Sequence, residues 1–134
     1  MGERENQKDM ALSYLNRAKE KLESARILLR EKKFDDAISR AYCATYLSAF
    51  AVLFLKGEIP KSHSGLISLF GIRLVKAGII PKEYAKILSE LFNARQNSDY
   101  AVLVWFDEED ANRFIKKAEK FVSKMQEIIN KMLE

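Results

Sequence analysis

The amino-acid sequence predicts an all-α fold, a five-helix antiparallel bundle with an up-and-down core formed by long first, second and fifth helices. Apolar residues recur every three or four positions in the first and last segments, which is the period of an amphipathic helix. Gly57, Pro60, Gly78 and Pro81 mark the breaks between segments. Only residues 101–106 (AVLVWF) have the composition of a strand, and they are too isolated to form a sheet.

The first helix is expected from about Gln7 to Glu31, with a single apolar stripe along it. The stripe consists of Ala11, Leu15, Ala18, Leu22, Ala25 and Leu29. The second helix is expected to begin at Asp35, as its N-cap, and to run to about Leu55, where Lys56 and Gly57 follow.

The second helix is apolar or small on every face from residue 41 onward, so it cannot be a surface helix with one wet side. It is either the central helix of the bundle or a helix whose outer face meets another subunit. Small residues allow two helices to approach closely, and we favour a homodimer seam here. The small residues of this segment are Ala41, Ala44, Ser48, Ala49 and Ala51.

The third helix is expected to start at a Ser62 cap and to reach about Ala77, with Gly78 as its stop. Pro81 suits the first turn of the fourth helix, because the missing N–H would be unpaired there in any case. This helix should carry Tyr84 to about Ser98.

Asp107 is expected to open the last helix, with three acidic residues in the first turn, where the helix dipole favours them. Its apolar stripe consists of Phe114, Ala118, Phe121, Met125, Ile128 and Met132. Residues 1–134 therefore form a single helical domain, long enough to bury roughly two-thirds of the surface of the unfolded chain.

Composition favours a soluble, cytoplasmic protein. The longest uncharged run, residues 41–55, has 15 residues, fewer than the roughly 20 that a membrane span needs. Cys43 is the single cysteine, so no intrachain disulfide can form and a reducing compartment is expected. Lys and Arg number 23, and Asp and Glu number 19. This excess of positive charge is small and dispersed, so by itself it does not indicate nucleic-acid binding.

Arg95 stands in line with the apolar residues of the fourth helix, three and four positions after Phe92 and Leu91. An arginine on a core-facing stripe needs a partner. Asp99, four residues on, shares its helix face, so spacing alone favours a structural Arg–Asp pair at the core edge.

The functional alternative is an anion site. A guanidinium held among apolar neighbours presents a planar fork that suits phosphate oxygens. The Tyr100 hydroxyl and the Asn97 amide would add donors, and Asp99 completes the candidate site. If a dimer seam passes this corner, two copies of Arg95 would line a cleft for a nucleotide or an RNA strand.

The order and spacing of several segments resembles the HEPN domains, specifically the small archaeal and bacterial helical proteins often paired with a minimal nucleotidyltransferase. The segments are LNRAKEKLESARILL, FDDAISRAYCATYLSAFAVL, KSHSGLISLF, ARQNSDY and DEEDANRFIKKAEKFV, and they cover nearly the whole chain. The resemblance implies a bundle that dimerises through the region of an Arg-x(4-6)-His motif, which cleaves RNA without a metal in the active members.

The motif departs from the family pattern at its last position. Arg95 matches, but Tyr100 occupies the histidine position. A tyrosine with a pKa near 10 is ionised in about one molecule in a thousand at neutral pH, so it is a poor general base. His63, the only histidine, is a candidate for the missing base, although packing or helix capping is the favoured role.

The family resemblance also implies, in some pairs, that the nucleotidyltransferase modifies a tyrosine two places beyond the motif histidine. Val102 occupies that position, so the modified tyrosine of the family has no counterpart there in this chain. Tyr100 as the modified residue is a hypothesis motivated by its hydroxyl within the motif. Trp105 and Phe106 are interpreted as core or dimer packing rather than as a platform for stacking bases.

Three functions follow for this sequence. The favoured one is a partner of a minimal nucleotidyltransferase in a toxin-antitoxin-like pair, which binds nucleotide or RNA phosphate at a homodimer cleft. Arg95, Asn97, Asp99 and Tyr100 are its candidate binding residues. The second is an active metal-independent RNase with Arg95 and Tyr100 as catalytic residues, and the third is a purely structural helical dimer. We predict neither a cofactor nor a metal site.

Overall fold

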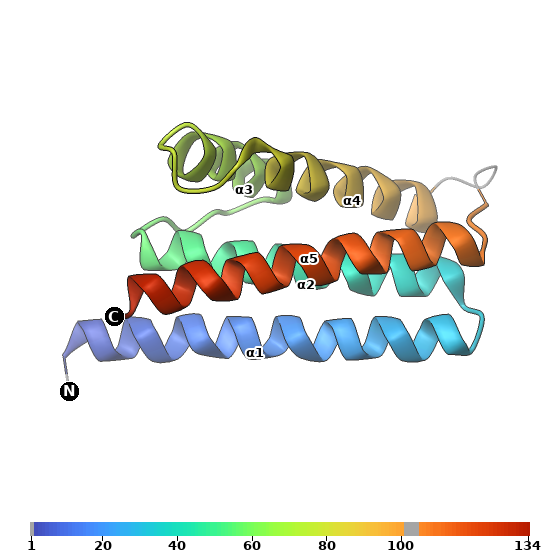
Figure 1. The fold of residues 1–134 in the computed structure, drawn as a ribbon, viewed down its shortest axis with the longest axis horizontal. Coiled ribbons are helices and arrows are strands. Elements are labelled where there is room, and N and C mark those ends of the chain that lie inside the picture. Colours follow the sequence, from blue (N-terminus) through green and yellow to red (C-terminus); the bar gives the residue numbers. More distant parts are fainter. Residues whose placement is uncertain (1, 101–104) are drawn as a thin grey trace.

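The computed structural model describes residues 2–100 and 105–134, and for residues 98–100 it describes the backbone alone. Within this part of the chain all regular structure is helical (Figure 1). The helices are α1 (Glu3–Arg30), α2 (Phe34–Leu55), α3 (His63–Phe70), α4 (Lys82–Tyr100) and α5 (Glu108–Met132), with a π-helical turn Gly71–Val75 extending α3. The predicted all-α, five-helix bundle is confirmed.

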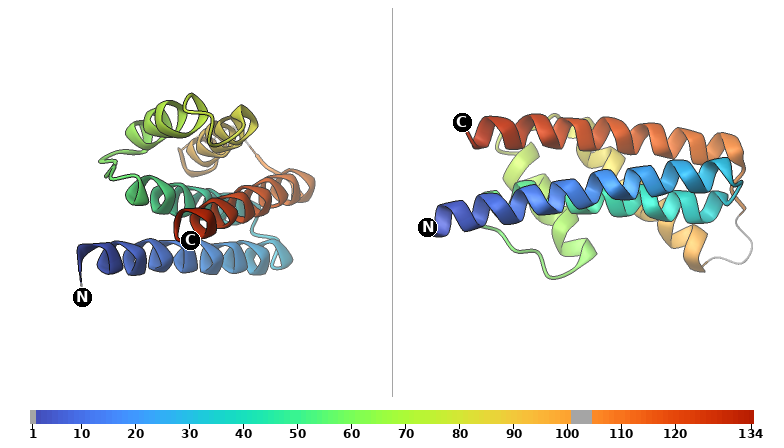
Figure 2. Two further views of the ribbon diagram at one scale, coloured as in Figure 1. Left: turned by 60° about the vertical axis from the view of Figure 1, so that its left-hand side comes forward. Right: turned by 90° about the horizontal axis from the view of Figure 1, so that it is seen from below.

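Helices α2 and α5 lie in the middle of the bundle, with α1 on one side of them and α3 and α4 on the other (Figures 1 and 2). Helices α2 and α5 run in one direction, and α1 and α4 in the opposite one (Figure 1). Helix α2 contacts α1, α3, α4 and α5, so it is the central helix of the bundle. Its length and composition would suit a membrane span, but more than half of its apolar stretch is buried inside the domain.

The small residues of α2 face the interior of this chain. All five are fully buried by other helices: Ala41, Ala44, Ser48, Ala49 and Ala51. The prediction that they form an intersubunit seam is therefore wrong, because no surface of theirs is left for a second copy. Small side chains at these positions instead let the neighbouring helices approach α2 closely.

Two predicted helix caps are confirmed. The Ser62 hydroxyl accepts a hydrogen bond from the Gly65 backbone N–H at 2.9 Å, and Asp107 forms a reciprocal capping box with Asp110. Asp35 as the N-cap of α2 is wrong: Lys33 occupies that position without a side-chain cap. Asp35 lies in the first turn, where its charge still complements the helix dipole.

The helix bounds differ from the predicted ones at several ends. Helix α1 begins at Glu3 rather than Gln7, because polar residues with good helical propensity extend the helix beyond its apolar stripe. Helix α4 continues to Tyr100 rather than Ser98. Gly78 has a φ of 79°, which explains why glycine ends the segment before α4.

Candidate functional site

Arg95 lies on the face of α4 that packs toward α2, as its spacing predicts. Its side chain is half-buried, and its Cζ atom is 5.5 Å from the centroid of the Tyr42 ring on α2. A guanidinium over an aromatic face is attracted by the negative potential of the ring. Helix α4 therefore holds this charge at the edge of the core, against a rigid aromatic side chain.

Tyr42 also binds the only histidine of the chain. Its ring is fully buried, and its Oη atom is 2.7 Å from Nδ1 of His63. Ser62 caps α3, so His63 is the first residue of that helix, and the loop before α3 brings it beside Tyr42. One buried hydroxyl on α2 thus links α3 to the neighbourhood of Arg95 on α4.

Aromatic rings fix the position of the His63 side chain. The centroid of its ring lies 4.6 Å from that of Tyr46, 5.6 Å from that of Tyr42 and 6.2 Å from that of Phe92. The residue as a whole remains exposed, so these ring contacts leave part of His63 open to solvent. His63 is therefore both oriented and accessible.

The charges of the site are set by burial and by Arg95. Burial raises the pKa of Tyr42 well above its ordinary value, an effect that Arg95 partly offsets, so the hydroxyl stays protonated. Partial desolvation lowers the pKa of His63 below 6.5, and the charge of Arg95 lowers it further. At neutral pH His63 is thus mainly neutral, and Arg95 carries the positive charge of the cluster.

The three-residue cluster of Tyr42, His63 and Arg95 was only partly predictable. The sequence marked Arg95 by its place on an apolar stripe and named His63 as a candidate base, but it gave no reason to select Tyr42. A tyrosine inside an otherwise apolar run is the available signal, because a buried hydroxyl requires a hydrogen-bond partner. The identity of that partner depends on how a loop folds back, which spacing does not reveal.

The structure does not bring Asn97 to this cluster. Asn97 lies two residues after Arg95 on α4 and therefore faces another way. It lines a separate hollow of about 300 Å³ that also includes Arg113 and Lys117 of α5. The side chains of Asp99 and Tyr100 lie outside the described residues, so the Arg95–Asp99 pair and the role of Tyr100 remain predictions.

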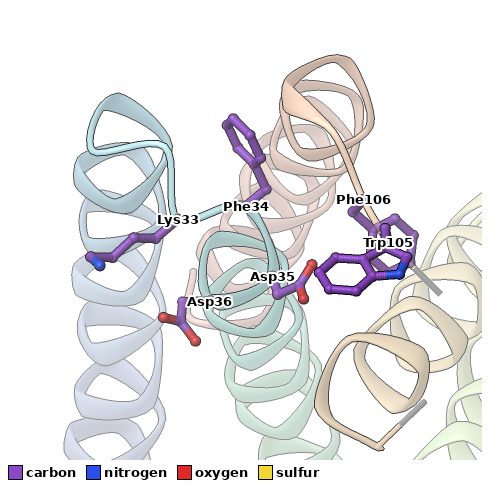
Figure 3. Close-up of a pocket in the computed structure, with 6 residues that line it drawn as sticks. All are labelled: Lys33, Phe34, Asp35, Asp36, Trp105 and Phe106. Carbon is purple, nitrogen blue, oxygen red and sulfur yellow. The ribbon is translucent and has the colours of Figure 1, made fainter. Parts of the chain in front are cut away.

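A second hollow, of about 430 Å³, lies where α2 begins and α5 approaches it (Figure 3). Trp105 lines it with Lys33, Asp35 and Asp36, so two carboxylates against one ammonium group disfavour a bound phosphate. Trp105 is 83% exposed, so it does not pack in the core of this chain, whereas Phe106 is half-buried and packs edge-on against Phe114. Core packing thus holds for Phe106 and is wrong for Trp105, for which dimer packing stays a prediction.

A row of aromatic side chains extends from His63 along the outer side of α2. The row, which we call the aromatic surface, consists of Tyr46, Phe50 and Phe54 with Tyr14 of α1. All four are half-buried. The centroids of neighbouring rings are 4.8 to 6.4 Å apart. A continuous, partly exposed aromatic strip of this kind is typical of an interaction surface.

The fold and the cluster define a small helical bundle that holds a half-buried arginine beside a hydrogen-bonded tyrosine–histidine pair. The family model described as "HEPN domain" matches residues 11–128, and the chain belongs to this family.

Curated relatives agree with the family assignment. A Thermotoga maritima protein named "UPF0332 protein" is 36% identical over 115 residues, which are 85% of this chain and 87% of that protein. A Methanocaldococcus jannaschii protein named "Putative toxin MJ0605" is 39% identical over 105 residues, 76% of this chain and 75% of that protein. The similarity thus covers most of the bundle in each case.

Proposed function

We propose that this protein is the toxin-type HEPN subunit of a two-protein system, and that Arg95 binds nucleotide or RNA phosphate at a homodimer cleft. The observation that carries the proposal is the placement of Arg95: a guanidinium held against Tyr42, next to a solvent-accessible histidine. Arginine forms short bidentate hydrogen bonds with phosphate oxygens, and apolar surroundings strengthen them.

The aromatic surface supports the homodimer. It begins next to His63, so a second copy seated on it would bring two clusters to the same cleft. The small buried residues of α2 play no part in this version of the interface. The partly exposed face of α2 forms the interface in this proposal.

The second protein of the pair is, in our proposal, a minimal nucleotidyltransferase. Support for it comes from the HEPN family assignment and from the word toxin in the name of a relative. Tyr100 as the residue that it modifies is part of the same proposal. The test is co-expression of this protein with a nucleotidyltransferase from an adjacent gene. Mass spectrometry is then expected to find an added nucleotide on Tyr100. A pair that co-purifies without one would remove the modification from the proposal.

Phosphate binding is tested with a single-stranded RNA of mixed sequence that is fully 2′-O-methylated, so that it can be bound but not cut. Arg95→Ala is expected to weaken binding about tenfold or more, because a charge-assisted hydrogen bond to phosphate contributes roughly 1.5–3 kcal/mol. Fluorescence anisotropy of the labelled oligonucleotide measures the dissociation constant.

Arg73→Ala is the matched control, since it also removes one positive charge. Arg73 lies on the π-helical turn, where it pairs with Glu58 at 2.9 Å. Its removal is expected to change the affinity less than about twofold, in line with an exposed charge away from the site. Equal effects of the two substitutions would mean that Arg95 acts only through the net charge of the protein. That result would contradict the proposal.

A further inference from the structure

We propose that His63, held by Tyr42 beside Arg95, is the proton-transfer residue of this site in the cleavage of RNA. This inference rests on the proposed phosphate site, and it assigns to His63 the role that the last motif position leaves open. Three elements supply the parts: α2 gives Tyr42, α3 gives His63 and α4 gives Arg95.

The position of His63 suits a general base. Its Nδ1 atom is engaged with Tyr42 at 2.7 Å, which fixes the ring and leaves Nε2 as the nitrogen for a substrate. Arg95 is close enough for its charge to affect His63, and the centroids of both Tyr42 and Phe92 lie within about 6.2 Å of the imidazole. Arg95 and His63 both contact Tyr42, so a phosphodiester bound to Arg95 would lie near His63.

A purely structural role explains the position of His63 less well. The cap of α3 is the Ser62 hydroxyl, so the helix does not need His63 for that purpose. The residue is exposed, whereas a side chain that served packing alone is expected to be buried. An oriented, accessible histidine next to an arginine is instead the geometry that general acid–base catalysis requires.

The protonation state of His63 agrees with this role. Among the side chains that the structure describes, the titratable and charged groups that face it are Tyr42 and Tyr46 from α2 and Arg95 from α4. Desolvation and the charge of Arg95 hold the pKa of His63 below its ordinary value, so the imidazole is neutral and able to accept a proton at pH 7.

The proposed step balances within the site and the substrate. Nε2 of neutral His63 accepts the proton of a ribose 2′-hydroxyl while O2′ forms a bond to phosphorus. The bond from phosphorus to O5′ breaks, and the leaving oxygen receives the proton from the imidazolium, directly or through water. The products are a 2′,3′-cyclic phosphate and a 5′-hydroxyl end.

Arg95 and Tyr42 assist this step without exchanging protons with the substrate. The guanidinium faces the non-bridging oxygens, where negative charge develops. Tyr42 is a positioning residue: its hydroxyl accepts a hydrogen bond from Nδ1–H when His63 uses Nε2 as the base. A tyrosine hydroxyl donates or accepts equally well, so one short contact serves both tautomers.

The test compares cleavage with binding in the full chain. A single-stranded RNA is incubated with wild type and with His63→Gln in the presence of a metal chelator, and the 2′-O-methylated oligonucleotide measures binding. Glutamine keeps a polar group near Tyr42 but cannot take up a proton near neutral pH. We expect His63→Gln to slow cleavage about 100-fold or more, with binding changed less than about threefold.

Tyr42→Phe gives a second measurement, the pH–rate profile, which would not change if Tyr42 only supported the fold. It removes the hydrogen bond to Nδ1, so the midpoint of the acidic limb of the pH–rate profile should shift. Cleavage should persist at a reduced rate, because the imidazole itself remains. Circular dichroism confirms that each variant keeps the helical content of wild type.

The outcomes separate this inference from the function on which it rests. Wild type that binds the RNA but leaves it intact would overturn the role of His63 and leave the phosphate site standing. Equal cleavage by wild type and His63→Gln would overturn it as well. Wild type that binds neither oligonucleotide would overturn the proposed function, and the inference with it.

Discussion

Tyr42 contacts the two residues on which the proposed chemistry of this protein rests. Its ring supports the Arg95 guanidinium at 5.5 Å, and its hydroxyl lies 2.7 Å from His63. Desolvation and the charge of the same arginine lower the pKa of His63, so the three side chains influence one another. A change at one of them should therefore be measurable at the other two.

The depressed pKa of His63 makes stability depend on pH in a predictable direction. In the unfolded chain His63 titrates near its ordinary pKa of about 6.5, whereas in the folded chain it binds a proton only at lower pH. The unfolded state thus gains protons first as the pH falls, so this residue stabilises the fold above about pH 6.5 and the contribution is lost below it.

His63→Gln should remove this part of the pH dependence. Urea unfolding at about pH 7.5 and about pH 5.5 is expected to show a larger loss of stability for wild type than for the variant. The carboxylates of the chain titrate in both proteins, so the comparison cancels their effect. Parallel stability curves for the two proteins would contradict the depressed pKa.

At the scale of helices, periodicity and capping residues predicted most of the fold. The stripes of α1 and α5 were visible because each helix has one wet face, and the buried residues Leu15, Leu22 and Met125 lie on them as expected. Ser62 and Asp107 were recognisable as caps, because each precedes a helix and has a side-chain oxygen that can accept.

Helix α2 was the element that periodicity could not resolve. A helix that is apolar all round gives no sign of which face meets its own chain and which meets a partner. The structure assigns the small residues, such as Ala44 and Ser48, to the interior and leaves Tyr46 and Phe50 partly exposed. The candidate interface therefore has aromatic rather than small side chains.

The candidate site was predictable only where it is local in sequence. Arg95 was identified from its place within one helix. The contact of Tyr42 with His63 joins residues 21 positions apart across the loop before α3, and spacing carries no information on such a contact. Asn97 is the converse case: it is close to Arg95 in sequence, but two residues along a helix point in different directions.

At the scale of the whole molecule, the aromatic surface makes a homodimer the expected state. Phe50→Glu places a charge in the middle of this surface, beside the Tyr14 ring at 4.8 Å, and should convert a dimer to a monomer. Ile72→Glu is the matched control, because Ile72 is 55% exposed on the π-helical turn and lies outside the surface. Sedimentation velocity measures the state of each protein.

We expect wild type and Ile72→Glu to sediment as dimers and Phe50→Glu as a folded monomer with weaker RNA binding. The loss of binding follows because a cleft between two subunits contributes two copies of the cluster. A wild-type protein that is monomeric at micromolar concentration would contradict the dimer and with it the shared cleft.

The most direct test of the account is the pKa of His63, measured by proton NMR. The chain has one histidine, so its imidazole resonances can be followed without ambiguity. We predict a pKa below 6.5 in wild type, a higher pKa in Arg95→Ala because a nearby positive charge is removed, and a higher pKa on binding of the 2′-O-methylated RNA. A pKa of about 6.5 or above that neither the substitution nor the RNA changes would contradict a site formed by His63 and Arg95.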